Sequence, residues 1–283
     1  METPLVSVLM TAFNREKYIA EAIESVLAST YKNFELIIVD DRSSDNTLSV
    51  AKSYAEKDAR VKVYCNEVNL GDYPNRNKAA SYAKGKYLKY VDSDDKIYSH
   101  CLEVMVNSME RFPEASWGLM AQCKSGWDKE FPFQLTPPEI FEYDERGMRI
   151  LSRAPLSMIF NRECFEKEGG FHPVRQWGDA EFTRRMAIQY NLVIIEPDLV
   201  WYRTHDEQEN ALNSKVKRFQ MAACNHFIEL YNSPRSNLDK ATTEKLIKKQ
   251  RKLRSAIIFD SLKRFRFKEA WSLYTMVKNN EKQ

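Results

Sequence analysis

The sequence predicts an α/β protein with a mostly parallel sheet, helices on both of its faces, and a helical C-terminal extension. From Leu5 to Ala121, short apolar runs alternate with segments that carry apolar residues at helical spacing. Alternation of this kind is typical of a parallel sheet whose strands are joined by helical crossovers. From about Ala211 to the end, the spacing is helical only. The sheet is therefore expected to end before that point.

The expected elements follow in chain order. Apolar runs predict strands at residues 5–10, 34–39, 61–64, 87–91, 116–121, 158–161, 192–195 and 199–203. Helical spacing predicts helices at residues 18–28, 44–54, 75–83 and 99–111, and a further helix that begins near Asp179. Ser44 is the expected N-cap of the second helix. Residues 124–145 break the alternation with prolines and aromatics, which predicts an ordered loop or a small edge hairpin.

Composition argues against several classes of protein. The 283 residues hold 43 Lys and Arg against 40 Asp and Glu, a net charge of +3, so we expect no nucleic-acid partner. The five cysteines are an odd number without a CxxC pair, which argues against a disulfide framework or a zinc ribbon and predicts a cytoplasmic location. No apolar run approaches the roughly 20 residues that span a bilayer.

Acidic residues gather where two of the expected strands end. Asp40 and Asp41 follow the strand at 34–39, and Asp92, Asp94 and Asp95 follow the strand at 87–91. Ligands bind at the carboxyl ends of the strands in open parallel sheets, and carboxylates there can hold Mg²⁺ or Mn²⁺ against phosphates. Aspartates also cap helices and occur in turns. Because two clusters occur at strand ends, we expect a cation site.

Three classes of protein with comparable acids fit the sequence badly. A phosphoacceptor response-regulator domain has its acidic pair after the first strand, whereas here the pair follows the second. A haloacid-dehalogenase-type phosphatase has Asp-x-Asp after its first strand, whereas here this motif lies near Asp92. A dinucleotide-binding dehydrogenase needs a Gly-x-Gly-x-x-Gly turn, and the sequence has none.

A fourth class fits through a series of ordered motifs. They are SVLMTAFNRE at 7–16, FELIIVDDRSSDNT at 34–47, NLG at 69–71, RN at 76–77, AKGKY at 83–87, DSDD at 92–95, GGF at 169–171, GDAEF at 178–182 and YRTH at 202–205. This series, from Leu5 to His205, resembles glycosyltransferase family 2. Two positions depart from the family pattern: Phe13 stands where the family usually has Tyr, and Arg42 where it usually has Gly.

The resemblance implies a GT-A-type, Rossmann-like fold and a division of the chain. Residues 1–205 would form the catalytic domain, with a nucleotide-binding half at about 1–121 and an acceptor half at 122–205. Residues 206–283 would form the basic helical extension. The oligomeric state stays open.

The activity implied is that of a metal-dependent, inverting glycosyltransferase. Such an enzyme would move a sugar from a nucleotide-diphosphate sugar to a hydroxyl of a saccharide or lipid-linked saccharide, in the synthesis of surface polysaccharide or glycolipid. The donor sugar, the base and the acceptor stay open. Two alternatives also stay open: a sugar nucleotidyltransferase, although residues 11–15 lack its Gly-rich loop, and a non-catalytic sugar-nucleotide-binding or scaffold protein.

The resemblance also assigns roles in donor binding. Thr11, Phe13 and Asp41 match positions that contact the base and ribose; the Phe13 ring offers a flat face to a base, and Asp41 can accept a hydrogen bond from a ring N–H. Phe13 can alternatively be a core aromatic. Arg76 is expected either to face the diphosphate or to be an ordinary solvent-facing helix residue.

Metal binding and catalysis are assigned in the same way. Asp94 would ligate a divalent cation, Mn²⁺ or Mg²⁺, with Asp92 on the ribose or in the metal shell and His205 beside the metal and diphosphate. Asp95 is expected to cap the next helix. Asp179 would be the general base that takes the proton of the acceptor hydroxyl; its alternative role is that of an N-cap.

The C-terminal extension is strongly basic in its second half. Residues 245–268 hold ten Lys and Arg and one acid, with apolar and aromatic residues between them. One interpretation is peripheral contact with an anionic membrane, on the inner face of the cytoplasmic membrane, which would suit a lipid-linked acceptor. The other is that the helices pack on the catalytic domain, with Trp271, Leu273, Tyr274 and Val277 as docking residues.

Overall fold

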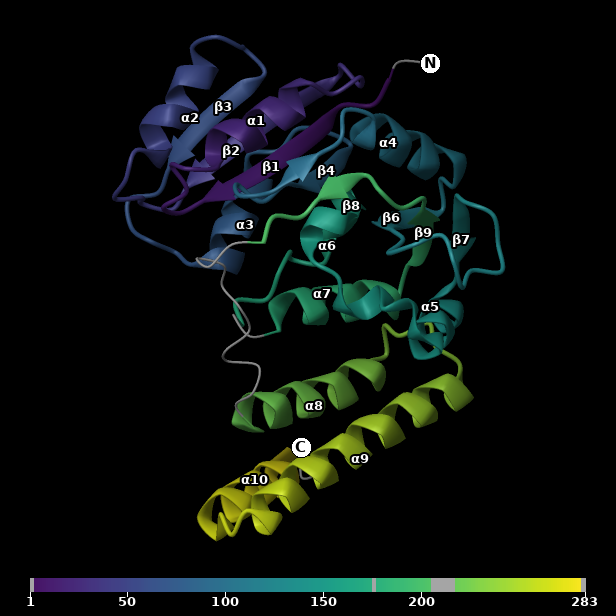
Figure 1. Cartoon of the computed structure of the whole chain (residues 1–283). Helices are drawn as coiled ribbons and strands as arrows, with labels where there is room; N and C mark the ends of the chain where they lie inside the picture. Colours follow the sequence, from purple (N-terminus) through teal and green to yellow (C-terminus); the bar gives the residue numbers. More distant parts are fainter. Residues whose placement is uncertain (1–2, 175–176, 205–216, 281–283) are drawn as a thin grey trace. The chain divides into compact units, whose positions relative to one another are not determined.

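The computed structural model describes residues 3–174, 177–204 and 217–280 of the chain (Figure 1). The chain divides into two compact units, Met1–His205 and Asp206–Gln283. None of the described helices combines the length and apolar character that crossing a membrane requires.

The first unit alternates strands and helices. Its strands are β1 (Val6–Ala12), β2 (Phe34–Asp40), β3 (Val61–Cys65), β4 (Tyr87–Tyr90), β5 (Lys96–Ile97), β6 (Ala115–Met120), β7 (Phe133–Leu135), β8 (Met158–Asn161), β9 (Asn191–Ile195) and β10 (Val200–Trp201). Its α-helices are α1 (Ile19–Leu27), α2 (Thr47–Ala55), α3 (Asp72–Ser81), α4 (Cys101–Arg111), α5 (Pro137–Tyr143), α6 (Arg162–Lys167) and α7 (Gly178–Ala187).

Eight strands form one sheet in the order β3-β2-β1-β4-β8-β6-β9-β7. Strands β3, β2, β1 and β4 are mutually parallel, as are β6 and β9, whereas β8 and the edge strand β7 run antiparallel to their neighbours. The short strands β10 and β5 pair separately. The prediction of an α/β fold with a mostly parallel sheet and a helical C-terminal region is therefore confirmed.

Helices cover both faces of the sheet. Figure 1 shows α1, α2 and α4 on one side and α3, α6 and α7 on the other. The first face is aliphatic: alternate β1 residues such as Val8 and Met10 pack with Ile23 of α1 and Met105 of α4. On the second face a cluster of aromatic rings has centroids 4.8 to 6.5 Å apart; its members are Tyr90, Phe160, Phe165, Phe171 and Phe182.

Two local predictions were wrong in part. The segment 124–145 contains the expected edge strand, β7, but continues as helix α5 rather than as a hairpin. Thr136 and Glu139 form a capping box at the start of α5, and prolines fill its first positions, where no N–H is needed. Ser44 does not cap α2; the carboxylate of Asp45 accepts from the backbone N–H of Thr47 at 3.0 Å, and the helix begins there.

The second unit contains, among its described residues, the helices α8 (Lys217–Tyr231), α9 (Lys240–Lys263) and α10 (Phe267–Asn280). Their shared core is small and includes Met221, Cys224, Ile257 and Leu273. Of the residues expected to dock, Leu273 is fully buried in this core and Val277 packs against it. Trp271 is instead 68% exposed.

Candidate active site

The candidate site lies where β1, β2 and β4 end. These strands are neighbours and parallel, so their carboxyl ends meet at one edge of the sheet. Thr11 lies near the end of β1, and Asp41 directly follows β2, its backbone N–H donating to the Ala12 carbonyl at 2.7 Å. Asp92 and Asp94 follow β4. The topology thus brings the acids of the two sequence clusters to the same edge.

Asp41 is buried and organises the loop that leads into α3. Its Oδ1 accepts hydrogen bonds from the Leu70 N–H and the Asn66 amide, both at 2.8 Å, and its Oδ2 accepts from the Gly71 N–H at 2.9 Å. Gly71 precedes α3 with a φ of 83°, a conformation that glycine adopts without strain. Asp41 therefore fixes the start of α3, in addition to any contact with a base.

Phe13 is 46% exposed, which excludes the core role that was its alternative. The ring lies just beyond the end of β1 and is available for stacking. Thr11 is half-buried on the same segment. The two residues remain predicted contacts of a base and ribose.

Each acid of the Asp-x-Asp segment pairs with an arginine. Arg76 of α3 donates to Asp92 at 2.6 Å and to Asp72 at 2.8 Å. Although burial alone would lower it, the charges of Asp72 and Asp92 raise the pKa of the Arg76 guanidinium above its ordinary value. Arg15 donates to Asp94 at 3.0 Å. Arg76 is 9% exposed, so it is not a solvent-facing residue.

Asp95 does not cap the next helix, which begins at Cys101 after an N-cap at His100. Its carboxylate instead accepts from the backbone N–H of Arg203 at 2.8 Å. Burial, followed by the charges of Asp92 and Asp94, raises the pKa of Asp95 to about 7. Asp95 therefore links the chain after β10 to the acidic segment.

The acidic segment offers suitable ligands for a divalent cation. Mg²⁺ and Mn²⁺ prefer carboxylate oxygens, and Asp92 and Asp94 supply them at the end of β4. Within the described ranges, no three His, Cys, Asp or Glu side chains form a metal-binding group. The predicted ligand His205 lies outside the described residues. The carboxylate oxygens of Asp94 and Asp92 are donors of the kind that a divalent cation binds. Their role as ligands stays a prediction.

Asp179 is the second residue of α7 and is half-buried. The N-cap of α7 is Trp177, so the alternative role of Asp179 as N-cap is wrong. The preceding residue, Gly178, packs against α3: a Cβ there would lie 2.6 Å from the Tyr73 ring. Burial, with a contribution from the Asp179 charge, raises the pKa of the Tyr73 hydroxyl. Helix α3 therefore makes two contacts with the site. Its Tyr73 packs on Gly178, next to Asp179, and its Arg76 binds Asp92.

Sequence reasoning assigned no role to several residues of this site. Arg15 and Arg203 lie inside the motifs at 7–16 and 202–205, so their positions carried a signal. Tyr73 lies outside every motif. Its contact with Gly178 spans more than 100 residues, and no local pattern indicates it.

A parallel sheet with an Asp-x-Asp segment after β4 and helices on both faces defines the GT-A type of nucleotide-sugar-binding fold. The sequence profile described as Glycosyl transferase family 2 matches residues 7–169. The chain belongs to this family.

Curated relatives carry related descriptions. The chain is 42% identical over 228 residues to an uncharacterized glycosyltransferase of Methanocaldococcus jannaschii, covering 77% of this chain and 76% of the relative. It is 38% identical over 164 residues to the putative teichuronic acid biosynthesis glycosyltransferase TuaG of Bacillus subtilis, covering 56% and 63%. A UDP-Glc:alpha-D-GlcNAc-diphosphoundecaprenol beta-1,3-glucosyltransferase, WfgD of Escherichia coli, is 39% identical over 109 residues, covering 38% and 42%. The matches span less than two thirds of TuaG and of WfgD.

Two solved structures share the fold. S. aureus TarS 1–349 in complex with UDP-GlcNAc superposes with a TM-score of 0.70 at 22% identity, covering 86% of this chain and 70% of the TarS 1–349 chain. The mannosyltransferase PcManGT from Pyrobaculum calidifontis, in complex with GDP-Man and Mn²⁺, gives 0.61 at 17% identity, covering 98% and 74%.

Proposed function

We propose that this chain is a cation-dependent, inverting glycosyltransferase that transfers a sugar from a nucleoside-diphosphate sugar to a hydroxyl of a lipid-linked saccharide. One observation carries the proposal: helix α3 contacts both Asp92, through Arg76, and the start of α7, through Tyr73. Helix α3 thereby positions both the acidic segment after β4 and the start of α7, which carries Asp179. Membership of glycosyltransferase family 2 supports the same function.

The donor would bind across the carboxyl edge of the sheet. The exposed Phe13 ring would stack on the base, and Thr11 and Asp41 would contact the base and ribose from β1 and β2. Asp92 and Asp94 would hold the cation, displacing the Arg15 guanidinium from Asp94. The cation, when bound, supplies Lewis-acid neutralisation of the diphosphate leaving group. The structure of PcManGT in complex with GDP-Man and Mn²⁺ supports this choice of ion.

Asp179 would act as the general base. A carboxylate that takes the proton of the acceptor hydroxyl during a single displacement typically contributes 10²- to 10⁴-fold to the rate. Attack from the face opposite the leaving diphosphate inverts the anomeric carbon. Asp179 is half-buried in the first turn of α7, where its carboxylate would accept the proton of the acceptor hydroxyl.

Two relatives support the proposed class of acceptor. WfgD is described as acting on a saccharide carried by a diphosphate-linked polyprenol, and TuaG as a glycosyltransferase of teichuronic acid synthesis. We therefore propose a role in the synthesis of a surface polysaccharide or glycolipid, and further propose that the chain works at the cytoplasmic leaflet. Contact with that leaflet would come from the basic and aromatic residues around the turn between α9 and α10 in the second unit.

Two variants separate binding from turnover. We expect Asp179→Asn to keep the Mn²⁺-dependent rise in melting temperature that a donor such as UDP-GlcNAc or GDP-Man produces, and to lower transfer at least about a hundredfold. Asp94→Ala should lose the Mn²⁺-dependent part of that rise. Asp198→Asn is the matched control, since Asp198 is exposed and its φ of 68° suits Asn.

The outcomes also separate the alternatives. Near-normal transfer by Asp179→Asn removes Asp179 from the mechanism, and unchanged metal dependence of Asp94→Ala removes Asp94 from the cation site. Donor binding without release of nucleoside diphosphate favours the scaffold alternative. Release of pyrophosphate from a nucleoside triphosphate favours the nucleotidyltransferase.

A further inference from the structure

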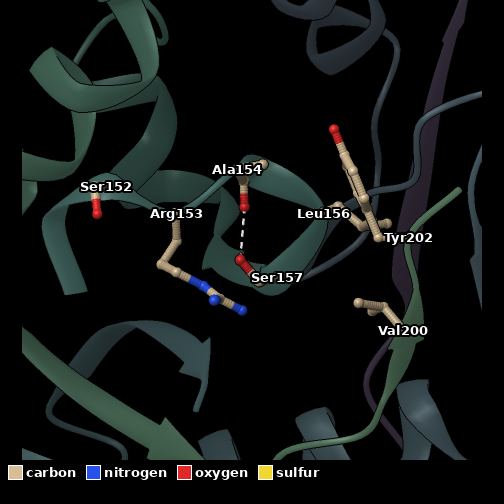
Figure 2. Close-up of a pocket in the computed structure, with 7 residues that line it drawn as sticks. All are labelled: Ser152, Arg153, Ala154, Leu156, Ser157, Val200 and Tyr202. Atoms are coloured by element: carbon tan, nitrogen blue, oxygen red, sulfur yellow. Dashed lines mark hydrogen bonds between the residues drawn. The ribbon is translucent and has the colours of Figure 1, made fainter. Parts of the chain in front are cut away.

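Arg153 lines a cavity of about 230 Å³ in the first unit (Figure 2). The cavity has two walls, one formed by the segment before β8 and one by β10 and the residue after it. Its lining residues are Ser152, Arg153, Ala154, Leu156, Ser157, Val200 and Tyr202. Figure 2 shows the Arg153 side chain extending from the first wall toward Ser157 and Val200.

The charge of Arg153 has no counterion in the part of the chain that the structure describes. Among the seven lining residues it is the one charged side chain, and no described carboxylate pairs with it. Burial, together with the positive charge of Arg149, lowers the pKa of the half-buried Arg153 guanidinium. A partly desolvated cation without a partner is costly, and a bound anion would remove that cost.

Both walls of the cavity are tied to the acidic segment. The Lys89 ammonium of β4 donates to the Leu156 carbonyl in the first wall. In the second wall, Val200 and Trp201 pair with β5, which directly follows Asp95. The two walls of the cavity are therefore bonded to β4 and β5, the strands on either side of the acidic segment.

We propose that this cavity binds a phosphate group of the lipid-linked acceptor, with Arg153 as its ligand; this inference rests on the proposed function. The guanidinium fork matches two phosphate oxygens. The donor diphosphate would already be held through the cation at Asp92 and Asp94. Among the described residues no acid lines the Arg153 cavity, so the cavity suits a phosphate that is bound by direct hydrogen bonds rather than through a second cation.

The test measures binding of a probe, undecyl diphosphate, to the full chain by titration calorimetry. The donor site is first saturated with Mn²⁺ and with UDP or GDP, whichever raises the melting temperature. We expect Arg153→Gln to weaken binding of undecyl diphosphate at least about tenfold and Arg153→Lys to weaken it less. Lys124→Gln, which removes one positive charge from an exposed position elsewhere in the first unit, should stay close to the wild type.

Two further measurements make the assignment specific. The affinity for Mn²⁺ and nucleoside diphosphate should be unchanged in Arg153→Gln; an equal loss there would assign the anion to the donor and overturn the proposal. The melting temperature of ligand-free Arg153→Gln should equal or exceed that of the wild type, because an unpaired charge is removed.

Failure of the wild-type chain to bind undecyl diphosphate, or equal binding by Arg153→Gln, overturns the proposal. Arg153-dependent binding without any sugar transfer would leave the phosphate site standing and overturn the proposed function alone.

Discussion

At the scale of single residues, buried acids of the first unit pair with partners from distant parts of the chain. Glu35 of β2 is 5% exposed and accepts from the Ser7 hydroxyl at 2.7 Å, the Lys62 ammonium at 2.6 Å and the Lys84 N–H at 2.8 Å. Burial would raise the pKa of Glu35, but these bonds outweigh it and hold the pKa below its ordinary value of 4.5. Glu35 thus joins β1, β2, β3 and the turn before β4.

We expect Glu35→Gln to lower the free energy of unfolding by about 1–3 kcal/mol at pH 7, because the amide cannot replace the charge-assisted bonds. Since the folded pKa is depressed, this stabilisation is present above the unfolded pKa of about 4.5 and is lost as the pH falls through the folded value. Urea unfolding should show the same difference between the two proteins at pH 7 and pH 5, and a smaller difference at pH 4 and pH 3. The exposed Glu56→Gln is the control, and a pH-independent difference would contradict the argument.

The acids at the strand ends could be predicted from the sequence, but their ion pairs could not. A run of apolar residues followed by aspartates is a local pattern, whereas Arg15 and Asp94 are 79 residues apart. At Arg42 the backbone conformation explains why the family pattern usually has Gly. Its φ of 67° is left-handed, where the family usually has Gly, which reaches this conformation at lower cost.

At the scale of elements, α3 and α7 set the geometry of the site through a contact between a glycine and an aromatic ring. A Cβ on Gly178 would lie 2.6 Å from the Tyr73 ring and 2.8 Å from the His172 carbonyl. The first turn of α7 can lie this close to α3 because residue 178 has no side chain. That close approach fixes the position of Asp179.

We expect Gly178→Ala to move the first turn of α7 and to lower kcat about tenfold to a hundredfold, with donor binding unchanged. The stability cost should be about 1–3 kcal/mol, as for other overpacked contacts. Gly147→Ala is the matched control: its Cβ would meet no atom within 4 Å, although its φ of 93° makes it lose stability as well. A fall in kcat of the same size in both variants would mean that general destabilisation is the cause.

Helix α5 shows which elements the sequence pattern missed. The expectation for 124–145 came from its prolines, which usually interrupt regular structure. Here Thr136 and Glu139 reciprocally cap the helix, and Pro137 occupies its first position. The capping signal was present in the sequence, but a helix of seven residues has too few apolar positions to show a helical period.

At the scale of the whole molecule, the small core of the second unit leaves several large aromatic rings exposed. The second unit carries a cluster of exposed rings around the turn between α9 and α10: Phe265 is 82% exposed, Phe267 62% and Trp271 68%. Four basic residues, which are Lys263, Arg264, Arg266 and Lys268, lie between or beside them. Exposed aromatics next to basic residues suit the interface of an anionic bilayer.

We expect the full chain to co-sediment with vesicles of phosphatidylserine and phosphatidylcholine at low salt, and not with phosphatidylcholine alone. The double variant Phe265→Ser and Phe267→Ser should weaken this binding at least about tenfold, because the buried ring area is lost. Neutralising Lys263 and Arg264 to Gln should weaken it by a similar factor, since each near-surface charge contributes about 1 kcal/mol, and should reduce its salt dependence.

The controls decide whether this surface is specific. Val68→Ser is the control. Val68 is an apolar residue of the first unit that is 62% exposed, so this variant also replaces an exposed apolar side chain by Ser but leaves the α9–α10 turn unchanged. If it weakens vesicle binding as much as the Phe265 and Phe267 changes do, the contact is nonspecific. Absence of binding to anionic vesicles at low salt would reject the membrane contact, because electrostatic attraction is strongest under that condition.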